Sequence, residues 1–298
     1  MVECDVWGVD VVGSSPIILT IFRDCGEIGK LTRLKICRRQ PCRFESDQSH
    51  QFGVNMKDLT NFREWFTEKY YNAEWINSAK VQYAQANPFP HIVIDNFLPP
   101  EVLDEVLIHF DSYNKDHWHK FDGKHELKLM SKSEFFIPQF IRHVLHELNS
   151  GYVLNWLEHL TQVPGLIADT RLYGGGLHNI ERGGKLGVHI DFNIENHTRM
   201  HRQLNLLLYL NKDWQDEWGG HLELWNADKT ECVQKIAPIF NRCVLFNTNG
   251  KPWHGHPHPL NTPDGVTRKS LALYYYNVGE ENAYFALMDS HSTLFETQ

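Results

Sequence analysis

The chain has 298 residues, of which 42% are hydrophobic and 22% charged, and its formal net charge is −8. This length and composition are those of a globular protein with a sizeable buried core. The acidic balance argues against a dedicated nucleic-acid binder, which needs a basic face for phosphate contacts. No stretch approaches the roughly 20 apolar residues of a membrane span, and the start, MVECDVWGVDVV, is acidic where a secretory signal is basic. We therefore expect a cytoplasmic protein without a membrane or nucleic-acid partner.

The first part of the chain differs from the rest. Residues 1–55 contain four of the six cysteines, a small basic cluster and no sustained periodicity, so we interpret them as a poorly specified N-terminal extension. From Leu59 the apolar residues follow i, i+3, i+4 spacing, which predicts an amphipathic helix over Asp58–Ala79. The proline-rich segment Asn87–Pro90 cannot continue that helix.

Two further helices and one strand are predicted before residue 165. The short β-branched segment His91–Phe97 is typical of a strand. Pro99–Phe110 begins with two prolines and continues with helical spacing, which predicts a helix with proline in its first turn. A second helical pattern runs over Pro138–Leu160 and is interrupted near Ser150 and Gly151. We expect residues 56–165 to form a helical N-terminal part that packs on the core.

After Ala168 the pattern changes to short apolar segments separated by glycine, proline, asparagine and aspartate. Eight candidate strands are Arg171–Ile180, Gly187–Phe192, Gln203–Asn211, Gly220–Trp225, Cys232–Pro238, Arg242–Asn247, Trp253–His256 and Lys269–Asn277. Short strands without intervening helices indicate a sandwich or barrel. The sequence thus predicts a mainly β, α+β protein with flanking helices. Residues 166–280 would form a jelly roll (double-stranded β-helix) of two four-stranded sheets around a cavity, and 281–298 a C-terminal tail.

A metal-ligand pattern lies on the second of these strands. Residues two apart on a strand share a face, so the imidazole of His189 and the carboxylate of Asp191 project together. An imidazole from a distant strand would complete the 2-His-1-carboxylate arrangement, which suits Fe(II) and leaves positions open for a co-substrate and O₂. Because the chain has 18 histidines, the pair alone is weak evidence, and the polar face of an ordinary strand would look the same.

Residues downstream could complete such a site. Three histidines, His254, His256 and His258, lie close together about 65 residues after His189, and each could be the distal ligand. Arg268 opens the last strand and offers a planar guanidinium that binds a carboxylate in bidentate fashion, as the far end of a dicarboxylate co-substrate requires. Ser270 shares its face and could add a hydroxyl donor. The competing interpretations are that Arg268 is an ordinary exposed arginine and that Ser270 is an ordinary strand serine.

The order of these residues resembles the Fe(II)/2-oxoglutarate-dependent dioxygenases of the prolyl 4-hydroxylase-like branch. The resemblance covers roughly residues 88–280 and includes NLLLYLNKDW followed by GGHLEL, RCVLFNT before WHGHP, and RKSLALYYY after it. It implies iron ligands at His189, Asp191 and His254, the last because an aromatic residue precedes it. It also implies that Arg268 binds the distal carboxylate of 2-oxoglutarate, with Tyr209 lending its hydroxyl.

The resemblance further implies a reaction. The cofactors would be Fe(II) with 2-oxoglutarate and O₂ as co-substrates, and ascorbate is expected in addition because members of this branch often require it. The enzyme would hydroxylate a C–H bond of a prolyl or other peptide substrate, or of a small amino-acid-like molecule, and release succinate and CO₂. Asp191 favours hydroxylation, since halogenating relatives lack that carboxylate.

Two alternatives and the choice of substrate stay open at this point. A non-catalytic jelly-roll binding module would keep the cavity without turnover, and a cupin-type metalloenzyme would use a His/Glu ligand set without needing Arg268. We expect the loops Ser112–Phe135 and Phe192–Arg202 at the cavity mouth to select the substrate. The second loop carries His197, Arg199, His201 and Arg202. We hypothesise that it binds a polar or acidic substrate, and a solvated loop is the competing interpretation.

Overall fold

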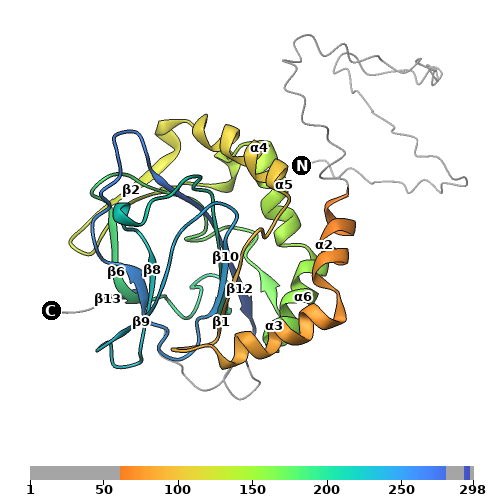
Figure 1. Cartoon of the computed structure of the whole chain (residues 1–298). Helices are drawn as coiled ribbons and strands as arrows, with labels where there is room; N and C mark the ends of the chain where they lie inside the picture. The colour runs from red at the N-terminus through yellow and green to blue at the C-terminus, as the bar shows by residue number, and fades with distance from the viewer. Residues whose placement is uncertain (1–60, 280–291, 296–298) are drawn as a thin grey trace, which may run out of the picture. The chain divides into compact units, whose positions relative to one another are not determined.

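The structure is a computed structural model that describes residues 61–279 and 292–295, all within the compact unit Phe52–Gln298 (Figure 1). The predicted extension 1–55 and most of the predicted tail 281–298 lie outside the described residues, and the proposed division into domains stays a prediction. In the part that the structure describes, no helix has both the length and the apolar character needed to cross a membrane.

Five α-helices are found in the described part of the chain. They are α2 (Phe62–Tyr70), α3 (Ala73–Gln85), α4 (Pro100–Asp111), α5 (Gln139–Leu148) and α6 (Gly151–Thr161). The single helix predicted over Asp58–Ala79 is wrong, because the chain breaks between α2 and α3. Asn72 has extended backbone and its side chain accepts hydrogen bonds from the backbone N–H groups of Glu74 and Trp75, so it caps a new helix. The other predicted helices are present, including the interruption before Gly151.

All eight strands predicted after Ala168 are present. They are β5 (Gly176–Ile180), β6 (Lys185–Ile190), β7 (His201–Tyr209), β8 (Leu222–Trp225), β9 (Cys232–Ile236), β10 (Cys243–Asn247), β11 (His254–His256) and β12 (Arg268–Asn277). Their order divides four and four, as β10-β7-β12-β5 and β6-β11-β8-β9. β1 (His91–Ile94) adds to the first half, and β3 (Glu126–Ser131) pairs with both β5 and β6. The jelly roll is confirmed, with its halves joined along one side by β3.

Four described strands were not predicted: β2 (Trp118–Asp122), β3, β4 (Ile167–Ala168) and β13 (Leu294–Phe295). β2 and β3 form a hairpin where a mouth loop was expected over Ser112–Phe135. Their sequences, WHKFD and ELKLMS, mix charged and apolar residues and do not stand out from an exposed loop. β3 is a strand because its backbone pairs with the edges of β5 and β6. β13, in the predicted tail, pairs with β6 opposite His189 and Ile190.

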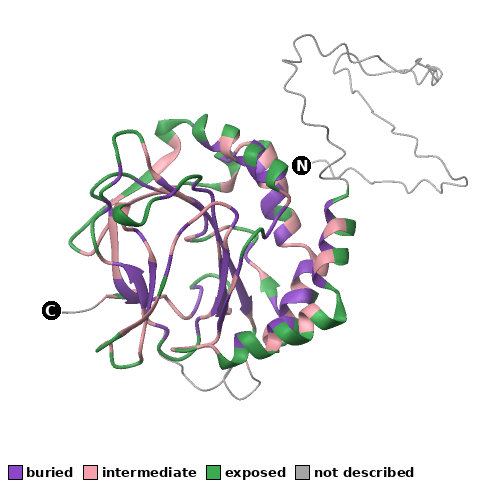
Figure 2. Ribbon diagram, viewed as in Figure 1, coloured by how far each residue is buried: buried purple, intermediate pink, exposed green. Residues whose placement is uncertain are grey.

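The helices lie against one face of the β10-β7-β12-β5 half, while β6, β8 and β9 lie on its other side (Figures 1 and 2). The two faces alternate along β7. Leu204, Leu206 and Leu208 belong to the core shared with the helices, and each buried leucine stabilises the fold by roughly 1.5–3 kcal/mol. Asn205 and Tyr209 point to the opposite face, into the interior of the jelly roll. The candidate site residues line this interior from both halves of the jelly roll.

Candidate active site

Three ligand-type side chains from two paired strands meet inside the jelly roll. His189 on β6 lies directly opposite His254 on β11, and Asp191 follows the end of β6. The Nε2 atom of His189 is 3.4 Å from Oδ1 of Asp191, and Nε2 of His254 is 3.4 Å from Oδ2 of the same carboxylate. One ligand atom from each residue lies within 4.8 Å of the other two. Within the described residues, these are the only three histidine, cysteine or acidic side chains grouped closely enough to hold a metal ion.

Both imidazoles of this triad are oriented by backbone carbonyl groups. Nδ1 of His189 is 2.9 Å from the carbonyl oxygen of Gly187, and Nδ1 of His254 is 2.8 Å from that of Pro252. A carbonyl oxygen only accepts, so each Nδ1 carries the proton and donates it. The Nε2 lone pairs are left facing Asp191, as metal-binding histidines require.

The structure separates the three candidates for the distal ligand. His254 lies in the triad, whereas His256 lines the cavity beside it and His258 is exposed. The preference for His254 came from the resemblance, and its role as the distal ligand stays a prediction.

Asp191 is held by two residues that sequence reasoning did not assign to the metal site. Nδ2 of Asn205 donates to Oδ2 of Asp191 at 2.7 Å, and Nη2 of Arg202 lies 3.2 Å from the same oxygen. Arg202 also donates from Nε and Nη2 to Oδ1 of Asn205, at 2.9 and 2.6 Å, and stacks 3.5 Å from the ring centre of Tyr274. Burial alone would raise the pKa of Asp191, but the positive charge of Arg202 holds it well below its usual value. The carboxylate is therefore ionised and ready to bind a metal.

Arg202 does not lie where the sequence analysis placed it. We expected it on the mouth loop Phe192–Arg202, but it lies on β7 and is 2% exposed, while Arg199 is exposed. The expected place of Arg202 on a loop is wrong, and its guanidinium contacts Asp191 and Asn205. Arg202 also lines the larger pocket that opens beside the triad, so the hypothesis that it binds a polar or acidic substrate stays a prediction. The polar residues Arg202 and Asn205 on a strand with a leucine-rich second half were the signal that could have revealed the contact with Asp191.

A cavity of about 70 Å³ connects the triad with Arg268, and Asn205 and Ser270 also line it. Arg268 is 5% exposed. Its Nε donates to the carbonyl oxygen of Gly220 at 2.7 Å, and its Nη2 donates to the hydroxyl of Tyr209 at 3.2 Å. No carboxylate within the described residues forms an ion pair with this guanidinium, and burial lowers its pKa. Arginine is rarely buried without a partner, so this cavity contains an uncompensated cation.

The two other predicted co-substrate residues lie near Arg268. Ser270 faces the cavity, directly across the β12–β7 pairing from Tyr209. Tyr209 is fully buried, with its ring centre 4.8 Å from the guanidinium carbon of Arg268. Its hydroxyl thus supports Arg268, and Tyr209 is not itself among the residues that line the cavity.

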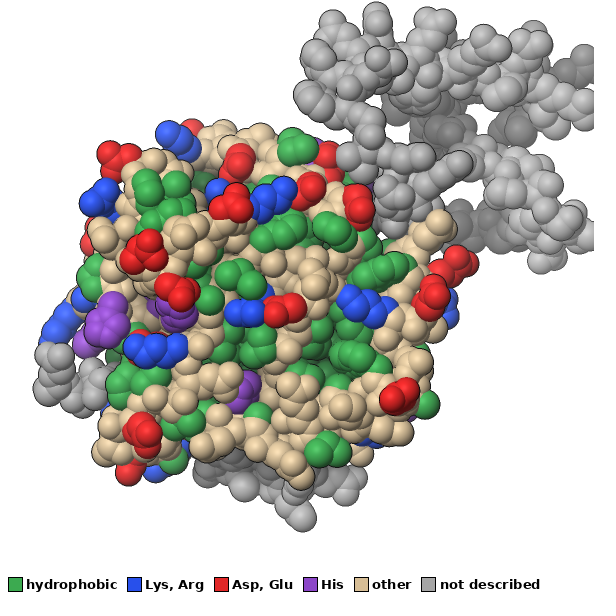
Figure 3. Space-filling view, in the orientation of Figure 1, with side chains coloured by type: hydrophobic (Ala, Val, Ile, Leu, Met, Phe, Trp, Pro, Cys, Tyr) green, Lys and Arg blue, Asp and Glu red, His purple; other side chains and the backbone are tan. Residues whose placement is uncertain are grey.

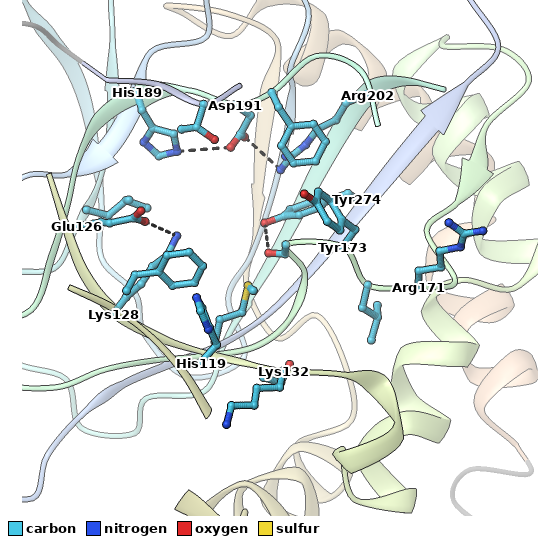
Figure 4. A pocket seen from close by; sticks show the side chains of 18 of the residues that line it. His119, Glu126, Lys128, Lys132, Arg171, Tyr173, His189, Asp191, Arg202 and Tyr274 are labelled. Carbon is cyan, nitrogen blue, oxygen red and sulfur yellow. Dashed lines mark hydrogen bonds and ion pairs between the residues drawn. The ribbon is translucent and has the colours of Figure 1, made fainter. Parts of the chain in front are cut away.

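A larger pocket of about 430 Å³ opens beside His189 and Asp191 (Figure 4). The hairpin β2–β3 forms the wall across from these two residues, with the ion pair between Lys128 and Glu126 at 3.2 Å. The hairpin, expected as a mouth loop, therefore does lie at the pocket.

The C-terminal strand β13 supplies another wall of this pocket. The ring of Phe295 stacks 5.2 Å from that of His125 and lies 5.5 Å from that of His189. Sequence reasoning missed this contribution, because two paired residues in a tail carry no periodic signal.

The chain was compared with known proteins. Residues 175–276 match the 2OG-Fe(II) oxygenase superfamily. No curated protein sequence matches the chain at a significant level. A prolyl hydroxylase from Trichoplax adhaerens, solved with a peptide fragment of the hypoxia inducible factor oxygen degradation domain, is similar with a TM-score of 0.51 and 18% identity, covering 75% of this chain and 99% of that one. A Pseudomonas putida prolyl-4-hydroxylase gives a TM-score of 0.49 and 15% identity, covering 68% and 100%.

The superfamily match spans β5 to β12, which contain the triad, the cavity and Arg268. The Trichoplax adhaerens structure shares the fold. Residues 175–276 therefore form a domain of the 2OG-Fe(II) oxygenase superfamily, and the chain is a dioxygenase that uses Fe(II), 2-oxoglutarate and O₂ in a prolyl-hydroxylase-like fold.

Proposed function

We propose that His189, Asp191 and His254 bind the Fe(II). Two imidazole nitrogens and one carboxylate oxygen are the donor set that suits Fe(II) with open positions, and their spacing, orientation and ionisation support this role. When bound, the metal supplies the activation of O₂ that oxidises 2-oxoglutarate to succinate and CO₂ and hydroxylates a substrate C–H bond. The chain's own contribution is to fix the three ligands, with Asn205 and Arg202 orienting Asp191.

We propose further that Arg268 binds the distal carboxylate of 2-oxoglutarate, with Ser270 beside it and Tyr209 holding the guanidinium. The observation that carries this proposal is the buried Arg268, which has no carboxylate partner among the described residues and shares one small cavity with the triad. A dicarboxylate whose 2-oxo acid end binds the metal must place its second carboxylate elsewhere in that cavity. A binding module without turnover and a cupin-type site do not need both a metal-binding triad and a buried arginine in the same cavity.

The proposed substrate is a peptide, with a prolyl residue as the first candidate, or a small amino-acid-like molecule. The pocket beside the triad, walled by a hairpin and by aromatic side chains, supports this class, and the similar Trichoplax adhaerens enzyme was solved with a peptide. On the face in Figure 3 acidic and basic side chains are interspersed, and no broad basic area that would suit a nucleic acid is seen there. A cytoplasmic location and a need for ascorbate are part of the same proposal.

The proposal is tested by incubating the protein with Fe(II), 2-oxoglutarate, ascorbate, O₂ and a library of proline-containing peptides. We expect succinate and a peptide heavier by one oxygen atom in equal amounts, measured by mass spectrometry. His189→Ala should abolish both products, and His258→Ala, at an exposed position nearby, should leave them unchanged. Succinate without an oxidised peptide from any member of the library would refute the peptide substrate. Equal oxidation by His189→Ala would refute the metal site.

A further inference from the structure

His256 lies two residues after His254 on β11 and faces the same cavity. The register shifts between the partners of His254 and His256 on β6. Gly255 permits this close pairing because it has no side chain. A Cβ atom there would lie 2.7 Å from the carbonyl oxygen of Gly187, and this clash could be relieved only by moving the strand. The glycine between the two histidines thus lets both imidazoles line the cavity wall.

The imidazole of His256 is buried, with an exposed fraction of 4%, and neither ring nitrogen has a hydrogen-bond partner within the described residues. His189 and His254 differ, because each donates from Nδ1 to a carbonyl oxygen. A neutral imidazole has one donor and one acceptor, and burying such groups unsatisfied is costly. An unsatisfied polar side chain in a cavity wall indicates that a ligand or water completes its hydrogen bonds.

We propose that His256 is a further binding residue for 2-oxoglutarate, and that its ring N–H donates to the same distal carboxylate that Arg268 binds. This inference rests on the proposed function. His256 and Arg268 line the same cavity, and both lack a partner that a carboxylate would supply. A carboxylate has about four acceptor sites, so it accepts from both residues at once. Water would satisfy the imidazole but not the charge of the guanidinium.

The second ring nitrogen of His256 does not conflict with this role. His256 also borders another cavity of about 290 Å³, lined in addition by Glu223 and Lys235. This space has room for water, but both ring nitrogens are shielded from solvent in the ligand-free protein. A small rotation of the imidazole is therefore needed before water donates to its acceptor nitrogen.

The test compares two 2-oxo acids by anaerobic calorimetry on the metal-loaded protein. The acid 2-oxobutyrate has the metal-binding end of 2-oxoglutarate but no distal carboxylate. We expect His256→Leu to weaken 2-oxoglutarate binding roughly tenfold or more, the usual effect of losing a hydrogen bond to a charged group. The affinities for 2-oxobutyrate and for the metal should stay unchanged, and His256→Gln should recover most of the loss. His258→Leu, at the exposed histidine two residues on, is the matched control and should behave as wild type.

The outcomes separate this inference from the proposed function. An unchanged affinity of His256→Leu for 2-oxoglutarate overturns the inference, and so does an equal loss for both acids, which would place its effect on the metal. If the wild type binds neither acid, the proposed function itself fails. Should His256→Leu not fold, nitrogen NMR of wild type loaded with Zn(II) gives the same answer. The ring N–H of His256 should become protected from exchange with 2-oxoglutarate and not with 2-oxobutyrate, and equal behaviour with both acids would overturn the inference.

Discussion

Arg268→Met is expected to separate stability from co-substrate binding. In the ligand-free protein the guanidinium is 5% exposed and has two neutral acceptors, Gly220 and Tyr209. Each such hydrogen bond stabilises by about 0.5–1.5 kcal/mol, while removing the charge from water costs several kcal/mol. Methionine fills much of the same space without that cost. We therefore expect the free energy of unfolding of the ligand-free variant to stay within about 1 kcal/mol of wild type, or to increase.

The same substitution should nearly abolish the stabilisation by 2-oxoglutarate. Two charge-assisted hydrogen bonds from Arg268 to a carboxylate are together worth about 3 kcal/mol or more, a loss of at least about 100-fold in affinity. At a concentration 100 times the wild-type Kd, 2-oxoglutarate stabilises the wild type by about 2.7 kcal/mol, but the variant by about 0.4 kcal/mol. For a unit of this size about 1 kcal/mol corresponds to 2–4 °C in Tm, so the wild type should shift by roughly 5–10 °C and the variant by about 1 °C.

Thermal unfolding of the anaerobic metal-loaded protein, with and without 2-oxoglutarate, measures both effects. Lys269→Met is the matched control, because Lys269 is the neighbour on β12 and pairs with Asp111 at 3.2 Å, away from the cavity. Lys269→Met should keep the full increase in Tm that 2-oxoglutarate produces in the wild type. A full shift in Arg268→Met would refute the role of Arg268, and a loss of several kcal/mol in the ligand-free variant would show that Arg268 mainly supports the fold.

Three further predictions concern the metal site and the strands around it. Arg202→Leu should lower the unfolding free energy of the metal-free protein by about 3–5 kcal/mol, because it leaves Asp191 buried without its cation. Urea titrations measure this loss, and bound metal should restore part of it. An unchanged stability would contradict the pairing of Arg202 with Asp191. Burial lowers the pKa of His178 from 6.5 to about 3, so between these pH values the unfolded chain binds a proton that the folded protein does not. The free energy of unfolding should therefore fall with decreasing pH, and His178→Asn should reduce this dependence by about 1.4 kcal/mol per pH unit. An equal dependence of stability on pH in the variant and the wild type would refute this role of His178. Gly255→Ala should lower the free energy of unfolding by about 3 kcal/mol or more and weaken metal binding, because a Cβ atom would lie 2.7 Å from a backbone oxygen. If the variant keeps the stability and metal affinity of the wild type, β11 can move away from this oxygen freely.

Much of the fold was readable because its strands are short, apolar and separated by turn residues. The eight strands after Ala168 were predicted for this reason, and the helices α4, α5 and α6 were predicted from the helical spacing of their apolar residues. The helix break at Asn72 was missed, because the apolar spacing continues through it and only the capping side chain reveals a new start. The hairpin β2–β3 was missed because its pairing partners are distant in sequence, so tertiary context decides it.

The site was readable where spacing along one strand was sufficient. His189 and Asp191 share a face by strand geometry alone, and Arg268 was singled out by its chemistry. The supporting contacts were not readable, because they depend on which strands are neighbours: Arg202 reaches Asp191 from β7, and Phe295 reaches His189 from the far end of the chain. The choice of His254 over His256 likewise needed the register between β6 and β11. The roles of these residues as ligands stay predictions until they are measured.

The central claim is that one cavity holds both the metal and 2-oxoglutarate, and an anaerobic titration tests it most directly. Fe(II) and 2-oxoglutarate are added to the purified protein while the visible absorption of the metal-chelated 2-oxo acid is followed. We predict a band in wild type that is lost in His189→Ala and His254→Ala and requires a far higher 2-oxoglutarate concentration in Arg268→Met. A folded, iron-loaded wild type without this band, or an unchanged band in His189→Ala, would contradict the account.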